Sequence, residues 1–223
     1  MNELVLVAVT SEPISVVGRV AATPKCQRLL PLLSCPCMLP QPLRRTPLLT
    51  YEDYRLLPED GPRYELIEGE LYLSPSPSTR HQTVSRRLQY ALMKALEDPG
   101  LAQVFNAPMD LVVDRNTAVQ PDLIIVGTAR TSIITARALE GAPDVVVEIL
   151  SPSTRDRDEH IKRRLYERFG VREYWLVDSE AETLIAYRRD DEGYGIRASY
   201  DRTGILECPE FPSLSLVLAD VFR

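Results

Sequence analysis

The sequence predicts an α/β domain with a mixed central β-sheet flanked by helices and an N-terminal β-hairpin. Three runs rich in β-branched residues, at 102–113, 119–126 and 144–150, have the continuous apolar character of strands buried on both faces. Two segments, at 79–97 and 155–169, instead repeat apolar residues at helical spacing. Because strands and helices alternate in the middle of the chain, we expect one mixed sheet.

Residues 1–43 lack this order. They are rich in Val, Leu, Pro and Cys and show no sustained helical or strand period. The basic start of a signal peptide is missing, because the first basic residue is Arg19. We expect 1–43 to be an unstructured leader or an extension from a misassigned start, with Met38 as the alternative start. The folded domain would then span 44–223.

The domain should begin with a short helix and the hairpin. Thr50 is a suitable N-cap, and the acidic residues after it favour the first turn of a helix that runs to about Leu57. Residues 64–73 read as two strands around Glu68-Gly69, which predicts the hairpin turn.

The two longer helices have clear ends. The helix at 79–97 stops at Pro99-Gly100, and its apolar positions are Val84, Leu88, Leu92 and Leu96. The helix at 155–169 follows a capping Ser-Pro-Ser-Thr segment and ends at Gly170, and its expected core stripe is Ile161, Leu165 and Phe169. Further strands are expected at 173–178, 184–188 and 195–200, the last two as an antiparallel pair.

Composition and charge restrict the class of protein. Hydrophobic residues are 44% and charged residues 26% of the 223, which excludes whole-chain disorder, collagen-like repeats and coiled coil. The sequence contains no run of about 18 apolar residues, so we expect no membrane span. The 32 Asp and Glu outnumber the 26 Lys and Arg, and the net charge of −6 argues against a large uniformly basic surface. A local basic groove beside acidic residues is still compatible with this total.

The four cysteines do not predict a metal site or a disulfide framework. Cys35 and Cys37 are separated by one residue, and no second pair follows at zinc-finger spacing. Cys26 and Cys208 stand alone. We interpret all four as free thiols of a cytoplasmic protein.

Two acidic residues lie within apolar strand runs. Asp122 precedes Leu-Ile-Ile-Val, and Glu148 follows Val-Val-Val. A carboxylate buried alone in such a run is unfavourable by several kcal/mol, so each should have a partner. Two alternatives are open. Each acid forms its own salt bridge or backbone hydrogen bond, or two acids on adjacent strands share one divalent cation.

Lys162 is the third candidate, on the helix that follows Glu148. It shares a helix face with Asp158 and Tyr166, one residue past the expected core residue Ile161. Asp158 and Lys162 are either a solvated i, i+4 pair, or Lys162 reaches across the strand ends. In the second case it would orient a water or stabilise charge on a phosphate.

Pro121-Asp122, followed by Glu148 and then by a nearby lysine, resembles the motif of the PD-(D/E)XK nuclease superfamily. The longer series of motifs resembles the Uma-type family of restriction endonucleases. The matching segments are 63–71, 74–77, 80–82, 119–123, 141–154 and 170–178. The resemblance extends from about residue 47 to the C-terminus and leaves the leader outside it.

The resemblance implies a restriction-endonuclease-like core that hydrolyses DNA phosphodiester bonds with a divalent cation. Asp122 and Glu148 would hold one or two Mg²⁺ ions, with Mn²⁺ as a substitute, and Glu65 would be a further ligand. The superfamily pattern has its lysine two residues after the second acid, where this chain has Leu150. In the Uma-type family the lysine lies on the following helix, which matches Lys162.

Two further residues are accessory candidates. His81 is either a helix-end residue bonded to the Ser-Pro loop or a contact to phosphate or metal-bound water. Tyr174 is expected in the core and is a minor candidate near the site. Glu68 is expected to be a turn residue and not a ligand.

DNA is the expected partner. Seven arginines are candidates for phosphate contacts or, alternatively, form a solvated charged face: Arg80, Arg86, Arg87, Arg155, Arg157, Arg163 and Arg164. A homodimer would suit cleavage of both strands of a two-fold site.

Two other functions stay open. The acidic net charge and the absence of a lysine at Leu150 are compatible with a catalytically weak binding or regulatory module that keeps the nuclease core. The second is a metal-dependent hydrolase that acts on a phosphoester other than DNA, because proteins of one fold can act on different substrates.

Overall fold

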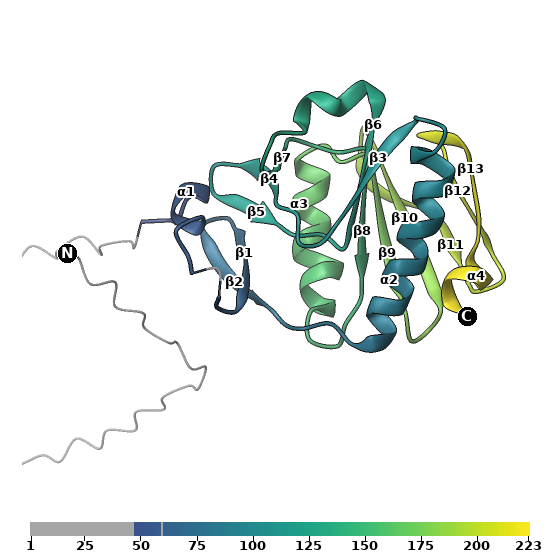
Figure 1. The fold of residues 1–223 in the computed structure, drawn as a ribbon, viewed down its shortest axis with the longest axis horizontal. Coiled ribbons are helices and arrows are strands. Elements are labelled where there is room, and N and C mark those ends of the chain that lie inside the picture. The colour runs from purple at the N-terminus through teal and green to yellow at the C-terminus, as the bar shows by residue number, and fades with distance from the viewer. Residues whose placement is uncertain (1–46, 59) are drawn as a thin grey trace, which may run out of the picture. The chain divides into compact units, whose positions relative to one another are not determined.

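A six-stranded mixed sheet forms the centre of the protein (Figure 1). The structure, a computed structural model, describes residues 47–58 and 60–223, so the predicted leader lies outside the described residues. The strands of the central sheet are β3 (Ala102–Asn106), β6 (Leu123–Gly127), β8 (Val145–Ile149), β9 (Glu173–Asp178), β10 (Thr183–Asp190) and β11 (Gly193–Tyr200). Their order is β11-β10-β9-β8-β6-β3, with β8 and β9 parallel and the other neighbours antiparallel. The predicted mixed sheet is confirmed.

Helices cover both faces of this sheet (Figure 1). On one face lies α2 (Thr79–Leu92), which continues as the π-helical turn η1 (Met93–Glu97). On the other lies the π-helical segment η3 (Arg157–Lys162), which continues as α3 (Arg163–Arg168). Alternation along β6 explains the two layers, because Leu123 and Ile125 join the core on the α2 side while Ile124 and Val126 join the core on the α3 side.

A second sheet of five short strands was not predicted. It consists of β1 (Arg63–Ile67), β2 (Glu70–Ser74), β4 (Leu111–Asp114), β5 (Thr117–Val119) and β7 (Leu139–Glu140), in the order β2-β1-β5-β4-β7. The run 102–113, expected as one strand, is divided at Pro108 into β3 and β4, which belong to different sheets. Proline has no N–H for a sheet ladder, which suits it to this boundary.

The predicted N-terminal helix and hairpin are both present. The helix α1 (Tyr51–Tyr54) is shorter than expected and begins with Thr50 and Asp53 in a reciprocal capping box. The hairpin β1–β2 turns at Glu68 and Gly69, whose φ values of 52° and 83° are those of a tight hairpin turn. Glu68 is therefore a turn residue, as predicted.

The C-terminal residues complete the core on the α2 side. A hairpin of β12 (Ile205–Cys208) and β13 (Phe211–Val217) is followed by the short α4 (Leu218–Phe222), and a 3₁₀ segment, η2 (Thr128–Ile133), lies after β6. Leu206 and Leu214 are fully buried against the residues of α2 and the central sheet. Among the helices of the described residues, none combines the length and the apolar character that crossing a bilayer requires.

Candidate active site

The two strand acids lie side by side at one edge of the central sheet. Asp122 directly precedes β6, Glu148 lies near the end of β8, and the antiparallel pairing of Leu123 with Val147 brings the two acids level with each other. Asp122 Oδ2 accepts a hydrogen bond of 2.7 Å from the backbone N–H of Ile149. Both side chains line one hollow of about 120 Å³.

Lys162 lies at the centre of a buried ionic cluster. Its Nζ is 2.8 Å from Glu65 Oε1, 2.9 Å from Glu148 Oε1 and 3.5 Å from Asp158 Oδ1. All four residues are at most 4% exposed. The interpretation of Asp158 and Lys162 as a solvated pair is therefore wrong, and Lys162 reaches across the strand ends. Three carboxylates offset the desolvation of one ammonium group, a partnership that burial of a charge requires.

The helix carrying Lys162 presents the predicted stripe in part, because Leu165 is buried and Phe169 packs against the core. Ile161, expected in the core, is 37% exposed, whereas Lys162 and Leu165 are buried. Asp158, Lys162 and Leu165 follow one another at i, i+4 and i+7, so they share the buried face of the helix, and Ile161 lies at the edge of that face.

Three site members were not among the predicted site residues. Asp158 and Tyr166 shared the helix face of Lys162 in the sequence, and that spacing was their only signal. Tyr166 donates a hydrogen bond of 2.7 Å to Glu148 Oε1. The backbone N–H of Gln120 donates one of 2.9 Å to Glu65 Oε1, a contact between β1 and the residues before β6 that no local pattern reveals.

The charges in the cluster shift one another. Burial raises the pKa of Glu148 well above its usual range; Lys162 opposes this shift, and the neighbouring carboxylates reinforce it. Burial likewise raises the pKa of Asp158 against the attraction of Lys162. For Lys162, burial favours the neutral form, but the charges of Glu148, Glu65 and Asp158 outweigh it and raise the pKa above its ordinary value. Lys162 is therefore a permanent cation at neutral pH.

His81 contacts the site, whereas Tyr174 supports it from the core. His81 Nε2 lies 3.2 Å from Asp122 Oδ2, and its Nδ1 is buried without a hydrogen-bond partner among the described residues. Burial would lower the pKa of His81, but the hydrogen bond and charge of Asp122 outweigh it and raise the pKa. Tyr174 is fully buried and donates its hydroxyl to the backbone carbonyl of Asp158, 3.0 Å away.

The predicted DNA-contacting arginines have different surroundings. Arg80 pairs with Glu182, and Arg155 pairs with Asp178 and Glu159. Arg157 lines the acidic hollow with its Nε 3.8 Å from Glu65 Oε2. The other four are Arg86 and Arg87 on α2, Arg163, whose guanidinium stacks over the Tyr187 ring, and the exposed Arg164.

The donor chemistry of the hollow fits a divalent cation at Asp122 and Glu148. Their Oδ1 and Oε2 atoms have no hydrogen-bond or ion-pair partner among the described residues, and hard cations prefer such oxygens. The four carboxylates at the hollow face three permanent cations, Arg63, Arg157 and Lys162, which leaves one negative charge when all four are ionised.

The cluster is not yet arranged as a closed metal site. Within residues 47–58 and 60–223, no group of three or more His, Cys, Asp or Glu side chains has that arrangement. One oxygen of Glu65 is already occupied, because Lys162 Nζ and the Gln120 N–H both contact Glu65 Oε1.

Comparisons with known proteins show the family of this chain. Residues 51–220 match the Uma2 family, described as a putative restriction endonuclease. The uncharacterized protein slr1290 of Synechocystis sp. (strain ATCC 27184 / PCC 6803 / Kazusa) is 28% identical over 184 residues, covering 79% of this chain and 93% of that protein.

A solved structure has the same fold. It is the crystal structure of a putative nuclease belonging to DUF820 from Anabaena variabilis ATCC 29413, and it superposes with a TM-score of 0.65 at 23% identity. The match covers 78% of this chain and 97% of the other. With a family match over most of its domain and the strand acids level at one sheet edge, the chain belongs to the Uma2 family of restriction-endonuclease-like proteins.

Proposed function

We propose that the protein is a DNA endonuclease that hydrolyses phosphodiester bonds with a divalent cation, Mg²⁺ or Mn²⁺. The observation that carries the proposal is the placement of Asp122 and Glu148 on neighbouring strands, with Lys162 Nζ 2.9 Å from Glu148. Membership in the Uma2 family and the fold shared with the Anabaena nuclease support the same activity.

Asp122 and Glu148 are the proposed ligands, and Glu65 is the proposed third carboxylate. When bound, the cation would acidify a water molecule and neutralise the oxygens around phosphorus. Asp122 is held for this role by the Ile149 N–H and by His81, which both engage Oδ2 and leave Oδ1 without a partner among the described residues. Glu148 is held in the same way through Oε1 by Lys162 and Tyr166.

Lys162 supplies fixed positive charge and does not act as a base. Its raised pKa keeps the ammonium protonated at neutral pH, so it can donate hydrogen bonds but cannot remove a proton from water. An ammonium preorganised beside the carboxylates stabilises negative charge that develops on the phosphate oxygens. His81 is a positioning residue that orients Asp122.

The test is nicking of supercoiled plasmid in Mg²⁺ or Mn²⁺. Wild type should nick, and Asp122→Asn and Lys162→Met should lose at least about 100-fold of the rate, the scale on which one electrostatic group at a transition state acts. Asp191→Asn changes charge equally at an exposed position and should keep the wild-type rate. Equal nicking by wild type, Asp122→Asn and Lys162→Met would contradict the proposed site.

One observation favours a second candidate, a nuclease-fold binding module without cleavage. Lys162 is close to three carboxylates, which is also how a purely structural buried ion cluster is built. Calorimetric titration of wild type with Mn²⁺ separates the two candidates. No binding with Asp122 and Glu148 intact would favour the module, whereas binding that Asp122→Asn abolishes would favour the nuclease.

A further inference from the structure

Three hollows adjoin one another, and the hollow of the carboxylates shares lining residues with each of the other two. A hollow of about 570 Å³ shares Arg63 and Gln120 with the hollow of the carboxylates. Another, of about 360 Å³, shares Gln82, Ala107 and Asp122 with it. The two flanking hollows have no lining residue in common, so the hollow of the carboxylates is the one that links them. A linear polymer that occupied all three hollows would pass Asp122 and Glu148.

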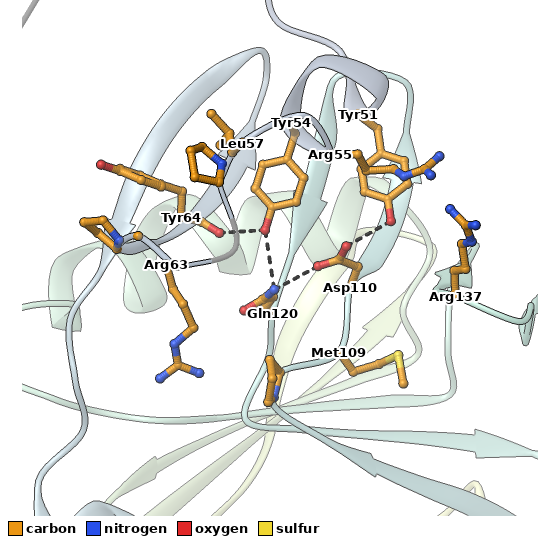
Figure 2. A pocket seen from close by; sticks show the side chains of 14 residues that line it. Tyr51, Tyr54, Arg55, Leu57, Arg63, Tyr64, Met109, Asp110, Gln120 and Arg137 are labelled. Atoms are coloured by element: carbon orange, nitrogen blue, oxygen red, sulfur yellow. Dashed lines mark hydrogen bonds between the residues drawn. The ribbon is translucent and has the colours of Figure 1, made fainter. Parts of the chain in front are cut away.

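The larger flanking hollow combines aromatic rings with free positive charge. We call it the tyrosine–arginine pocket, after the side chains Tyr51, Tyr54, Arg55, Arg63, Tyr64 and Arg137 that line it. Figure 2 shows Arg63 and Arg137 on opposite sides of Gln120 and Asp110. All three arginines are exposed, and none forms an ion pair with a residue of the described chain. In a protein of net charge −6, they create a local site for an anion.

A hydrogen-bond network holds the walls of this pocket in place. Tyr51 donates its hydroxyl to Asp110 Oδ2 over 2.9 Å, and Gln120 Nε2 donates to Asp110 Oδ1 over 2.9 Å. Tyr54 donates to the backbone carbonyl of Tyr64 over 2.8 Å (Figure 2). The rings of Tyr51 and Tyr54 are stacked with centroids 6.0 Å apart. Preorganised rings lose little freedom when a ligand binds, which favours recognition.

Gln120 connects the pocket to the carboxylates. Its side chain belongs to the network of the tyrosine–arginine pocket, while its backbone N–H donates to Glu65 Oε1, which also contacts Lys162. A group bound in the pocket would therefore lie next to Gln120, the residue that also contacts Glu65 at the site of proposed chemistry. The pocket is an extension of that site and not a separate surface feature.

The paired chemistry of the pocket matches a nucleotide. Aromatic side chains stack on bases, and arginine guanidinium groups bind phosphate. We propose that the tyrosine–arginine pocket holds a nucleotide of the substrate strand next to the scissile phosphate, with its base against the tyrosines and its phosphate on the arginines. This inference rests on the proposed nuclease function.

The proposal specifies the kind of DNA. Bases of an intact duplex are stacked inside it, and a base reaches a protein pocket only from a single strand or after extrusion. The preferred substrate should therefore have unpaired nucleotides beside the cut, and binding of single strands should depend on the pocket more than binding of duplex does.

Fluorescence anisotropy in EDTA tests the proposal without cleavage. The probes are a labelled single-stranded oligonucleotide of about 12 nucleotides, within the site sizes of such grooves, and the duplex of the same sequence. Arg137→Ala and Tyr64→Leu should each raise the single-strand Kd at least about fivefold, the lower end for loss of one stacked base or its contacts. The duplex Kd should change less. Tyr64→Leu keeps the net charge, so it isolates the aromatic contribution.

The matched control is Arg202→Ala, which removes the same charge at an exposed arginine paired with Glu182. Its single-strand Kd should stay within about twofold of wild type, as for a surface charge outside the contact. Circular dichroism verifies that each variant is folded. Unchanged single-strand affinity in Arg137→Ala and Tyr64→Leu, or equal losses in Arg202→Ala, would overturn the proposal.

A competition arm distinguishes a nucleotide in the strand from a free nucleotide. Deoxyadenosine monophosphate that binds in a Tyr64-dependent manner while the oligonucleotide does not bind would overturn the in-strand assignment. Failure here is separable from failure of the proposed function, because binding is measured without metal. Pocket-dependent binding with no nicking by wild type would end the nuclease proposal and leave the pocket assignment standing.

Discussion

Lys162 Nζ lies 2.8 Å from Glu65 Oε1, although Glu65 belongs to the N-terminal hairpin and Lys162 to the helix after β8. This contact joins the second sheet to the central sheet at the proposed site. Because Glu65 and Lys162 are both buried, each charge depends on close partners of opposite charge. The hairpin therefore contributes a residue to the proposed site.

Replacing Lys162 should destabilise the fold. Lys162→Met leaves Glu65, Glu148 and Asp158 without their shared cation, and breaking a buried ion pair in this way costs about 3–5 kcal/mol. Urea denaturation at neutral pH measures the loss in unfolding free energy. Lys94→Met, at an exposed lysine on η1, should change it by less than about 0.5 kcal/mol. A loss below about 1 kcal/mol for Lys162→Met would mean that the ionic cluster contributes little to the fold.

Addition of Mn²⁺ or Mg²⁺ should stabilise the wild-type protein. A ligand that binds only the folded state adds about 2.7 kcal/mol at 100 times its Kd. The Tm of wild type should be higher with metal than with EDTA, whereas the Tm of Asp122→Asn should be the same in both. Asp122→Asn keeps an acceptor for the Ile149 N–H but loses the charge. The same rise in Tm for both proteins would place the metal elsewhere.

The buried Glu173 should make stability fall with rising pH. Burial raises its pKa in the folded state, while the Trp175 Nε1–H bond at 2.7 Å and Arg197 oppose the shift. Above the ordinary glutamate pKa of about 4.3, the unfolded chain releases this proton while the folded protein still binds it. The contribution of Glu173 is thus fully present below that pH and is lost as pH rises through the folded-state pKa.

Denaturation of wild type and Glu173→Gln between acidic and neutral pH measures this effect. The difference in unfolding free energy, wild type minus variant, should decrease as pH rises. Glu192→Gln removes the same charge at an exposed acid and is the control for a general effect of charge. A difference that grows with pH would indicate a lowered pKa for Glu173.

Gly69 should tolerate no side chain. Its φ is 83°, and a Cβ added there would lie 2.6 Å from Leu48 Cβ. Gly69→Ala should therefore destabilise the protein by about 1–3 kcal/mol, the range for a non-glycine residue held in a left-handed conformation. Gly195→Ala is the matched control, because its added Cβ meets nothing within 4 Å. Equal denaturation midpoints for the two variants would contradict the prediction.

The sequence alone determined the elements whose side chains obey a local rule. The Val-Val-Val run became β8, the Glu-Gly turn made the hairpin, and the four apolar positions of α2 and its continuation η1 are all fully buried. In each case the signal comes from residues close together in the sequence, because strand alternation, turn conformation and helical spacing are local patterns.

Tertiary structure decided the rest. The strands β5 and β7 have three and two residues, too few to show a period, so their pairing depends on partners distant in the sequence. Lys162 was placed one residue outside the expected stripe because that stripe was chosen from apolar residues alone, whereas the buried face includes Asp158 and Lys162. Its burial is tolerable only because Glu65, Glu148 and Asp158 converge on it from three separate elements. Compensation of a buried charge is a property of the folded neighbourhood, and no local pattern in the chain encodes it.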